Sequence, residues 1–186
     1  MAISKIGSNS VNLAAGLDIS DGDITLASGH GISFAATSNA APTGGGVGNQ
    51  AEILVDYEKG TWTPVDASGA SITFAQKQGS YVKIGDQVTA WCYLNFPSSV
   101  SNTGATQIIG LPFTTAAAGD DSSGTSARGL GAISFQDTGT DYMSVVPIRA
   151  TQQLEFYNES GSNITNNVFS SSKTIMCGVC YHTGIG

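Results

Sequence analysis

The fold of this chain is decided by the stretch Leu54-Val55-Asp56-Tyr57-Glu58-Lys59-Gly60-Thr61-Trp62-Thr63-Pro64. The sequence before it is small and repetitive, rich in Gly, Ala, Ser and Asn, whereas the segments after it alternate between apolar and polar residues. Tyr57 and Trp62 are large anchors around a charged turn of Asp56, Glu58, Lys59 and Gly60, and Pro64 ends the element or places it at a sheet edge. We therefore interpret the stretch as the joint between an N-terminal arm, residues 1–50, and a folded β domain, residues 51–186. The alternative is that it is only the first strand of a domain, with Trp62 in its core.

Composition limits the function classes. The 186 residues suffice for one domain and an extension without disulfide or metal staples. Charged residues make up only 11% while Gly numbers 24, a balance typical of β-rich extracellular or virion surfaces. The net charge of −7, with scattered Lys and Arg, argues against nucleic acid and against an anionic membrane as partners. We see no secretory signal and no membrane-spanning run, so we expect synthesis in a cytosol and transport elsewhere by assembly.

Period-2 alternation is clearest over residues 87–96. One face of this predicted strand carries Val88, Ala90, Cys92, Leu94 and Phe96, which we expect in the core. The other face carries Trp91 and Tyr93 among polar residues. That second face is either covered by a neighbouring subunit or forms a ligand surface.

Strand signals recur at regular intervals along the β domain, and no segment has helical periodicity. About eight strands at this spacing predict an all-β fold, a jelly-roll-like antiparallel β-sandwich whose edges symmetric assembly can cover. Beyond the joint, we expect strands at residues 71–74, 79–84, 87–96, 107–113, 130–136, 142–150, 153–158 and 172–182, with Gly85 and Asp86 in a hairpin turn.

The arm contains a near-repeat of short apolar-polar-apolar units separated by Gly- or Asp-containing turns. Strands this short bury their apolar side chains only by stacking on one another or on partner chains. We read residues 1–36 as an oligomerising stem; two small hairpins packed on the domain are the alternative. Residues 37–50 form a Gly-rich linker, without the Lys and helix that a phosphate loop requires. The apolar residues of the arm that we expect to make these stacking contacts are Leu17, Ile19, Ile24, Leu26, Ile32 and Phe34.

No pattern in the sequence indicates a metal site. Cys177 and Cys180 have the spacing of half a zinc site, but residues three apart on a strand point to opposite faces and no second pair follows. We expect buried, inert cysteines. Asp18, Asp21 and Asp23 lack the rest of a calcium loop and are interpreted as turn residues.

No constellation of side chains indicates catalysis either. Neither His30 nor His182 has an evident Ser or Asp partner, and Glu155 and Glu159 are not a convincing glycosidase pair. We predict no enzyme, no cofactor and no metal. Aromatic side chains that could stack on a sugar define a candidate glycan or partner surface instead; these are Trp91, Tyr93 and Tyr157.

Three linked motifs carry a resemblance to a known family. They are residues 56–64 (Asp-Tyr-Glu-Lys-Gly-Thr-Trp-Thr-Pro), residues 79–88 (Gly-Ser-Tyr-Val-Lys-Ile-Gly-Asp-Gln-Val) and residues 110–113 (Gly-Leu-Pro-Phe). Their order and spacing over residues 50–186 resemble the C-terminal β domains of bacteriophage tail fibres and tailspikes. The resemblance implies a virion protein, and residues 1–50 match the short-repeat segment that often precedes such domains.

A tail fibre of this family usually carries a long N-terminal attachment region, whereas the lead-in here is about 50 residues. We therefore expect a stand-alone version: a homotrimeric capsid decoration (cement) protein on the outer capsid, with the major capsid protein as partner. A tail-fibre or tailspike tip that binds host-surface glycans is the alternative.

Overall fold

The computed structural model describes residues 32–33, 53–54, 57–117, 129–139 and 142–183. The chain divides into two units, Met1–His30 and Gly31–Gly186, and the first lies wholly outside the described residues. Every described residue belongs to the second unit. Calcium and arm predictions for residues 1–31 and 34–36 lie outside the described part of the chain.

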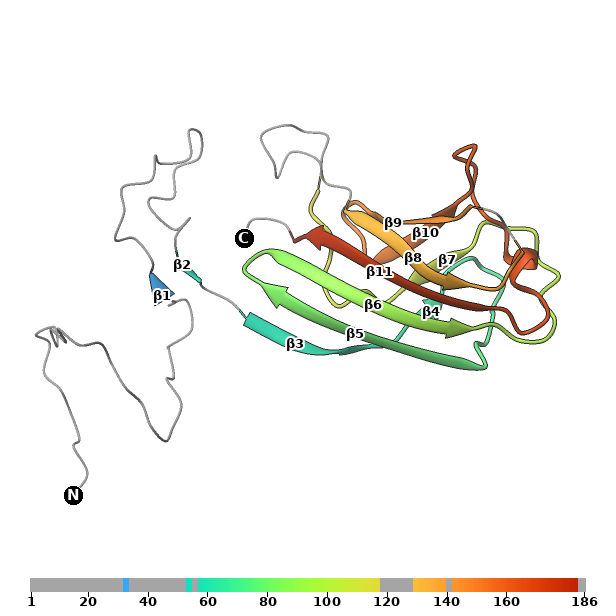
Figure 1. Ribbon diagram of the computed structural model, residues 1–186, viewed down its shortest axis with the longest axis horizontal. Helices are drawn as coiled ribbons and strands as arrows, with labels where there is room; N and C mark the ends of the chain where they lie inside the picture. The colour runs from blue at the N-terminus through green and yellow to red at the C-terminus, as the bar shows by residue number, and fades with distance from the viewer. Residues whose placement is uncertain (1–31, 34–52, 55–56, 118–128, 140–141, 184–186) are drawn as a thin grey trace, which may run out of the picture. The chain divides into compact units, whose positions relative to one another are not determined.

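The larger sheet has five antiparallel strands, and Figure 1 shows them side by side. Its central pairing, β6 with β11, joins segments far apart in sequence, from Gln87↔His182 to Asn95↔Thr174. In spatial order the strands are β3 (Tyr57–Trp62), β5 (Gln76–Ile84), β6 (Gln87–Asn95), β11 (Thr174–His182) and β8 (Leu130–Gln136).

The smaller sheet has four antiparallel strands: β4 (Val65–Asp66), β7 (Gln107–Ile109), β10 (Gln153–Tyr157) and β9 (Ser144–Ile148). A short 3-10 helix, η2, spans Asn166–Phe169 and follows β10. Separately, β1 (Ile32–Ser33) pairs with β2 (Ile53–Leu54). Among the described residues, no helix is long and apolar enough to cross a membrane.

The core lies between the two sheets because each sheet turns its apolar face toward the other. Strand β6 alternates as predicted, with the side chains of even-numbered residues buried and those of odd-numbered residues facing outward. Phe96 and Phe169 stack with ring centroids 4.3 Å apart, and Phe156 meets Phe169 edge-on. Further core residues from the two sheets include Ile175, Val179, Tyr181, Ile108, Val145 and Leu154.

The structure confirms an all-β fold built from antiparallel sheets, and most predicted strands are present with shifted ends. The strand order does not establish a jelly roll, and the trimer is not tested; both stay predictions. The sequence pattern did not indicate β4 or η2. The expected charged turn is wrong, because Glu58, Lys59 and Gly60 pair with β5 as part of strand β3, and Trp62 is buried, as the alternative of a first strand expects.

One strand prediction is wrong: residues 71–74 are not a strand. The backbone N–H of Ile72 donates to the Asp66 carboxylate at 2.9 Å, and the Ser68 hydroxyl donates to the same side chain at 2.6 Å. The Asp66 carboxylate thus accepts the Ile72 N–H that the carbonyl of a neighbouring strand would otherwise accept. Phe74 is nevertheless buried against Phe96, with ring centroids 5.0 Å apart, so the apolar signal there came from core packing.

Candidate functional site

The first two sequence motifs pair across β3 and β5 through two glycines and two aromatic rings. Gly60 lies opposite Tyr81, and Gly79 lies opposite Trp62. A Cβ on Gly79 would lie 2.6 Å from the Trp62 indole, and one on Gly60 would lie 2.9 Å from the Tyr81 ring. Each glycine therefore leaves room for the ring from the facing strand.

The third motif, residues 110–113, packs against the paired strands β3 and β5. Gly110 has φ +109°, and a Cβ there would lie 2.5 Å from the Thr63 carbonyl oxygen. The Phe113 ring meets Tyr81 edge-on at 5.4 Å, and its carbonyl accepts a hydrogen bond from the Tyr181 hydroxyl at 3.1 Å. We call the set Gly60, Trp62, Gly79, Tyr81, Gly110 and Phe113 the motif cluster.

Packing and hydrogen bonding raise the pKa of two tyrosines, Tyr81 in the motif cluster and Tyr181 beside it. Burial raises the pKa of Tyr181 to about 12, partly opposed by the hydrogen bond that the Phe113 backbone N–H donates to the Tyr181 hydroxyl oxygen. Tyr81 donates to the Glu58 carboxylate, and this hydrogen bond raises the Tyr81 pKa. Both raised pKa values keep Tyr81 and Tyr181 neutral near neutral pH, where their hydroxyl groups serve as hydrogen-bond donors within the fold. The motifs that carry the family resemblance are thus explained by folding.

The candidate site lies instead on the outer face of the five-stranded sheet. This face carries exposed large apolar side chains, of which Trp91 is 47% and Phe135 49% exposed. A bulge shapes it: the β8–β11 register shifts between Met176 and Cys177, and Ser134 donates to the Met176 carbonyl at 3.1 Å. The exposed apolar residues of the outer face are Tyr57, Ile84, Trp91, Leu130, Phe135 and Met176.

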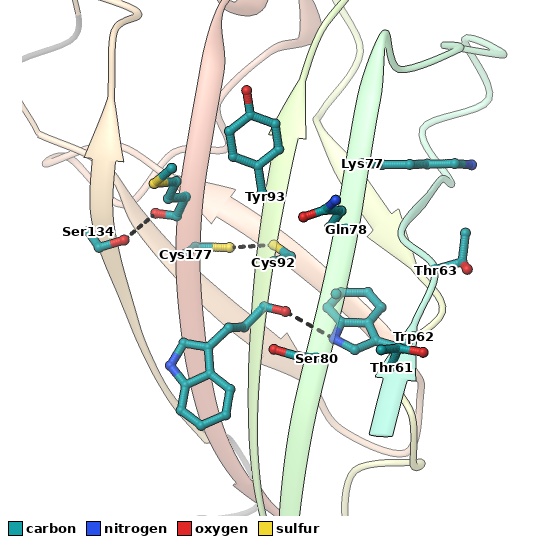
Figure 2. Close-up of a pocket in the computed structure, with 13 residues that line it drawn as sticks. Thr61, Trp62, Thr63, Lys77, Gln78, Ser80, Cys92, Tyr93, Ser134 and Cys177 are labelled. Atoms are coloured by element: carbon teal, nitrogen blue, oxygen red, sulfur yellow. Dashed lines mark hydrogen bonds between the residues drawn. The ribbon is translucent and has the colours of Figure 1, made fainter. Parts of the chain in front are cut away.

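An open groove of about 620 Å³ runs across this face. Trp91 and Tyr93 from β6 and Met176 from β11 supply its apolar walls, and Figure 2 shows Tyr93, Gln78 and Ser80 rising from neighbouring strands. The lining includes no carboxylate, and Lys77 is its charged member. The floor is firm, since the buried Trp62 donates its Nε1–H to the Trp91 carbonyl at 3.1 Å. The groove combines aromatic surface with hydroxyl and amide groups: Thr61, Thr63, Gln78, Ser80 and Ser134.

The structure places the three predicted aromatic residues on two surfaces. Trp91 and Tyr93 line the groove together. Tyr157 lies on β10 in the other sheet, where its hydroxyl donates to Glu155. Of the six predicted arm contacts, the structure describes the backbone of Ile32 alone, which pairs with Leu54 in β1–β2.

Of the remaining candidate residues, the structure describes Cys177, Cys180, Glu155, Glu159 and His182. Cys177 is buried and Cys180 is on the opposite face of β11, as predicted, though Cys180 is only half-buried. Within the described part of the chain no group of three or more His, Cys, Asp or Glu side chains could hold a metal. The expectation that His182 lacks an Asp partner is wrong, because Nδ1 lies 3.5 Å from the Asp86 carboxylate; both side chains are largely exposed.

Comparisons with known proteins agree with the fold. No protein-family model matches the chain, and no curated protein matches it. The crystal structure of the Dettilon tailspike protein (gp208) matches with a TM-score of 0.51 and 14% sequence identity, over 68% of this chain and 24% of the tailspike chain. The chain thus shares the fold of part of a tailspike and spans about a quarter of that protein's length.

Proposed function

We propose that this chain is a structural protein of a bacteriophage virion, displayed on the particle surface. The observation that carries the proposal is the shared fold with a tailspike, to which the three motifs independently point. The motif cluster gives the sequence likeness a physical basis, because its glycines and rings are needed for the β3–β5 pairing and the turn after β7.

A tail-fibre or tailspike module is one candidate for its place in the virion, because the solved structure that shares its fold is a tailspike. Capsid decoration is the second candidate, and the breadth of the apolar outer face favours it. Six exposed apolar side chains on one sheet face are suited to burial against a neighbouring subunit or the major capsid protein. In either place we propose a homotrimer, whose combined contacts would multiply weak single ones.

Copy number in purified virions separates the two places. Quantitative mass spectrometry would measure this chain against the major capsid protein. A ratio near one per capsid subunit, or a simple fraction of it, would establish decoration. A few tens of copies per particle would establish the tail module, and absence from the particle would reject the proposal.

As a tail module, the chain would bind a host-surface glycan in the outer groove and would not cleave it. The C–H faces of a sugar ring stack on Trp91 and Tyr93, while its hydroxyl groups exchange hydrogen bonds with Gln78 and nearby hydroxyls. The lining, without a carboxylate, suits a neutral or acidic sugar.

The test is glycan binding by the full chain, with host surface polysaccharide as the probe in calorimetry. We expect Trp91→Ala or Tyr93→Ala to weaken binding about tenfold or more, equal to about 1.4 kcal/mol. Tyr157→Ala is the matched control, an aromatic on the other sheet, and should bind as wild type. If all three variants bind the glycan with wild-type affinity, the groove is not the glycan site. The proposal of a virion protein would not depend on that result.

A further inference from the structure

Two buried sulfur atoms face each other in the core of the five-stranded sheet. Cys92 on β6 and Cys177 on β11 are directly opposite in the antiparallel ladder. Their Sγ atoms lie 2.9 Å apart, and both side chains are buried. No other ladder position pairs two cysteines: Cys180 lies opposite Thr89, on the outward side of β11.

We propose that Cys92 and Cys177 are a disulfide site, at which oxidation forms a cross-strand bond. The inference rests on this geometry and is independent of the proposed function. Directly opposed residues of an antiparallel pair have Cα separations of about 4.5–5.5 Å, within the range that a disulfide spans. A bonded S–S pair lies at about 2.05 Å, so the sulfurs need approach by less than about 1 Å.

The step is a two-electron oxidation with a disulfide such as oxidised glutathione as the oxidant. Both S–H bonds break and the Cys92–Cys177 S–S bond forms. The two electrons and two protons pass to oxidised glutathione, whose own S–S bond breaks to give two molecules of reduced glutathione.

The timing of the step follows from burial. Contact with the Cys92 sulfur and then burial raise the pKa of Cys177 well above its ordinary value. The thiolate that attacks a disulfide is therefore scarce in the folded chain, and exchange with a bulky oxidant is slow. The bond forms fastest while the chain folds, after β11 has paired with β6 and before the four-stranded sheet covers the two sulfur atoms.

The bond would close a ring across 85 sequence positions. The ring contains β7, β9 and β10, three of the four strands of the smaller sheet, and the edge strand β8 of the larger sheet, so it ties these strands to β6 and β11. A ring of this length restricts the unfolded chain strongly, and the oxidised protein should melt on the order of 10 °C higher than the reduced one.

The test is thiol mapping of the full chain, folded either with oxidised glutathione or with a phosphine reductant. Each sample is quenched in acid, unfolded, alkylated with a maleimide and weighed intact. We expect three alkylated cysteines after reduction and one, Cys180, after oxidation, with a cross-linked peptide that contains Cys92 and Cys177. In Cys180→Ser we expect two alkylated cysteines after folding with the reductant and none after folding with oxidised glutathione.

Three alkylated cysteines after oxidative folding would overturn the proposal, and so would a bond or glutathione adduct at Cys180 alone. Cys92→Ala should abolish the redox-dependent shift in melting temperature while Cys180→Ser keeps it. If Cys92→Ala does not fold, the wild-type chain still gives the answer, because its peptide map either contains or lacks the cross-linked peptide with Cys92 and Cys177.

Discussion

Replacing Gly79 by alanine tests the packing on which the motif cluster depends. The new Cβ would lie 2.6–2.7 Å from three atoms of the Trp62 indole, closer than nonbonded carbon atoms approach. Trp62 cannot easily yield, because it is only 7% exposed and its Nε1–H is bonded to the Trp91 carbonyl. The ring must move, and the hydrogen bond is strained or lost.

The expected cost combines three effects. Overpacking a core costs about 1–3 kcal/mol, and weakening the indole hydrogen bond costs about 1 kcal/mol more. Alanine gains about 0.5–1 kcal/mol over glycine in a strand because it restricts the unfolded chain. The net free energy of unfolding should fall by about 2 kcal/mol, which lowers the melting temperature by about 6 °C.

Gly178→Ala is the matched control in the same sheet. A Cβ at Gly178 would lie 3.1 Å from Trp91, whose side chain is 47% exposed and free to shift. We expect a change within about 0.5 kcal/mol. Urea unfolding followed by circular dichroism would measure both variants.

A double-mutant cycle isolates the contact between glycine and ring. In a Trp62→Leu background the cost of Gly79→Ala should disappear, because the indole that it meets is gone. If Gly79→Ala is as stable as wild type, or costs the same without the indole, the packing argument is wrong.

Other predictions follow from the core, from titration and from the arm. Phe169→Ala should cost about 3–5 kcal/mol in urea unfolding, because it removes a ring that contacts both Phe96 and Phe156; a loss below 1 kcal/mol would contradict its central role. The Tyr181 pKa of about 12 exceeds the ordinary value of 10, so its neutral form stabilises the fold below pH 10 and that contribution is lost as pH rises toward 12. Tyr181→Phe should flatten this alkaline decline in melting temperature, and an unchanged decline would place its cause elsewhere. Deleting residues 1–36 should abolish trimer formation or particle attachment while the sandwich still folds; a deletion variant that is still trimeric by light scattering and still binds particles would refute the stem.

The positions of strands were predictable where local pattern sets them. Strand β6 has one face of side chains buried in the core and one in solvent, so its apolar and polar residues alternate along the sequence. Gly85 adopts the positive φ that the predicted hairpin turn requires. The divergence of Cys177 and Cys180 was predictable for the same reason, because side chains three apart on a strand must point to opposite faces.

Other local features escaped prediction because side chains overrode the pattern. Residues 71–74 look like a strand, but Asp66 accepts the Ile72 N–H and keeps the segment out of a ladder. Tyr157 has the same aromatic character as Trp91, yet which sheet each joins depends on strand pairing that no short pattern encodes.

The sequence by itself determined the all-β class, the inward and outward faces of the strands and the three motifs, because these depend on period-2 burial and turn chemistry. Only the tertiary structure decided what those residues do together. It pairs β6 with β11, which brings Cys92 to within 2.9 Å of Cys177, and it sets Trp62 on Gly79 across β3 and β5. Such contacts join segments distant along the chain, and their partners are chosen by the packing of the whole core.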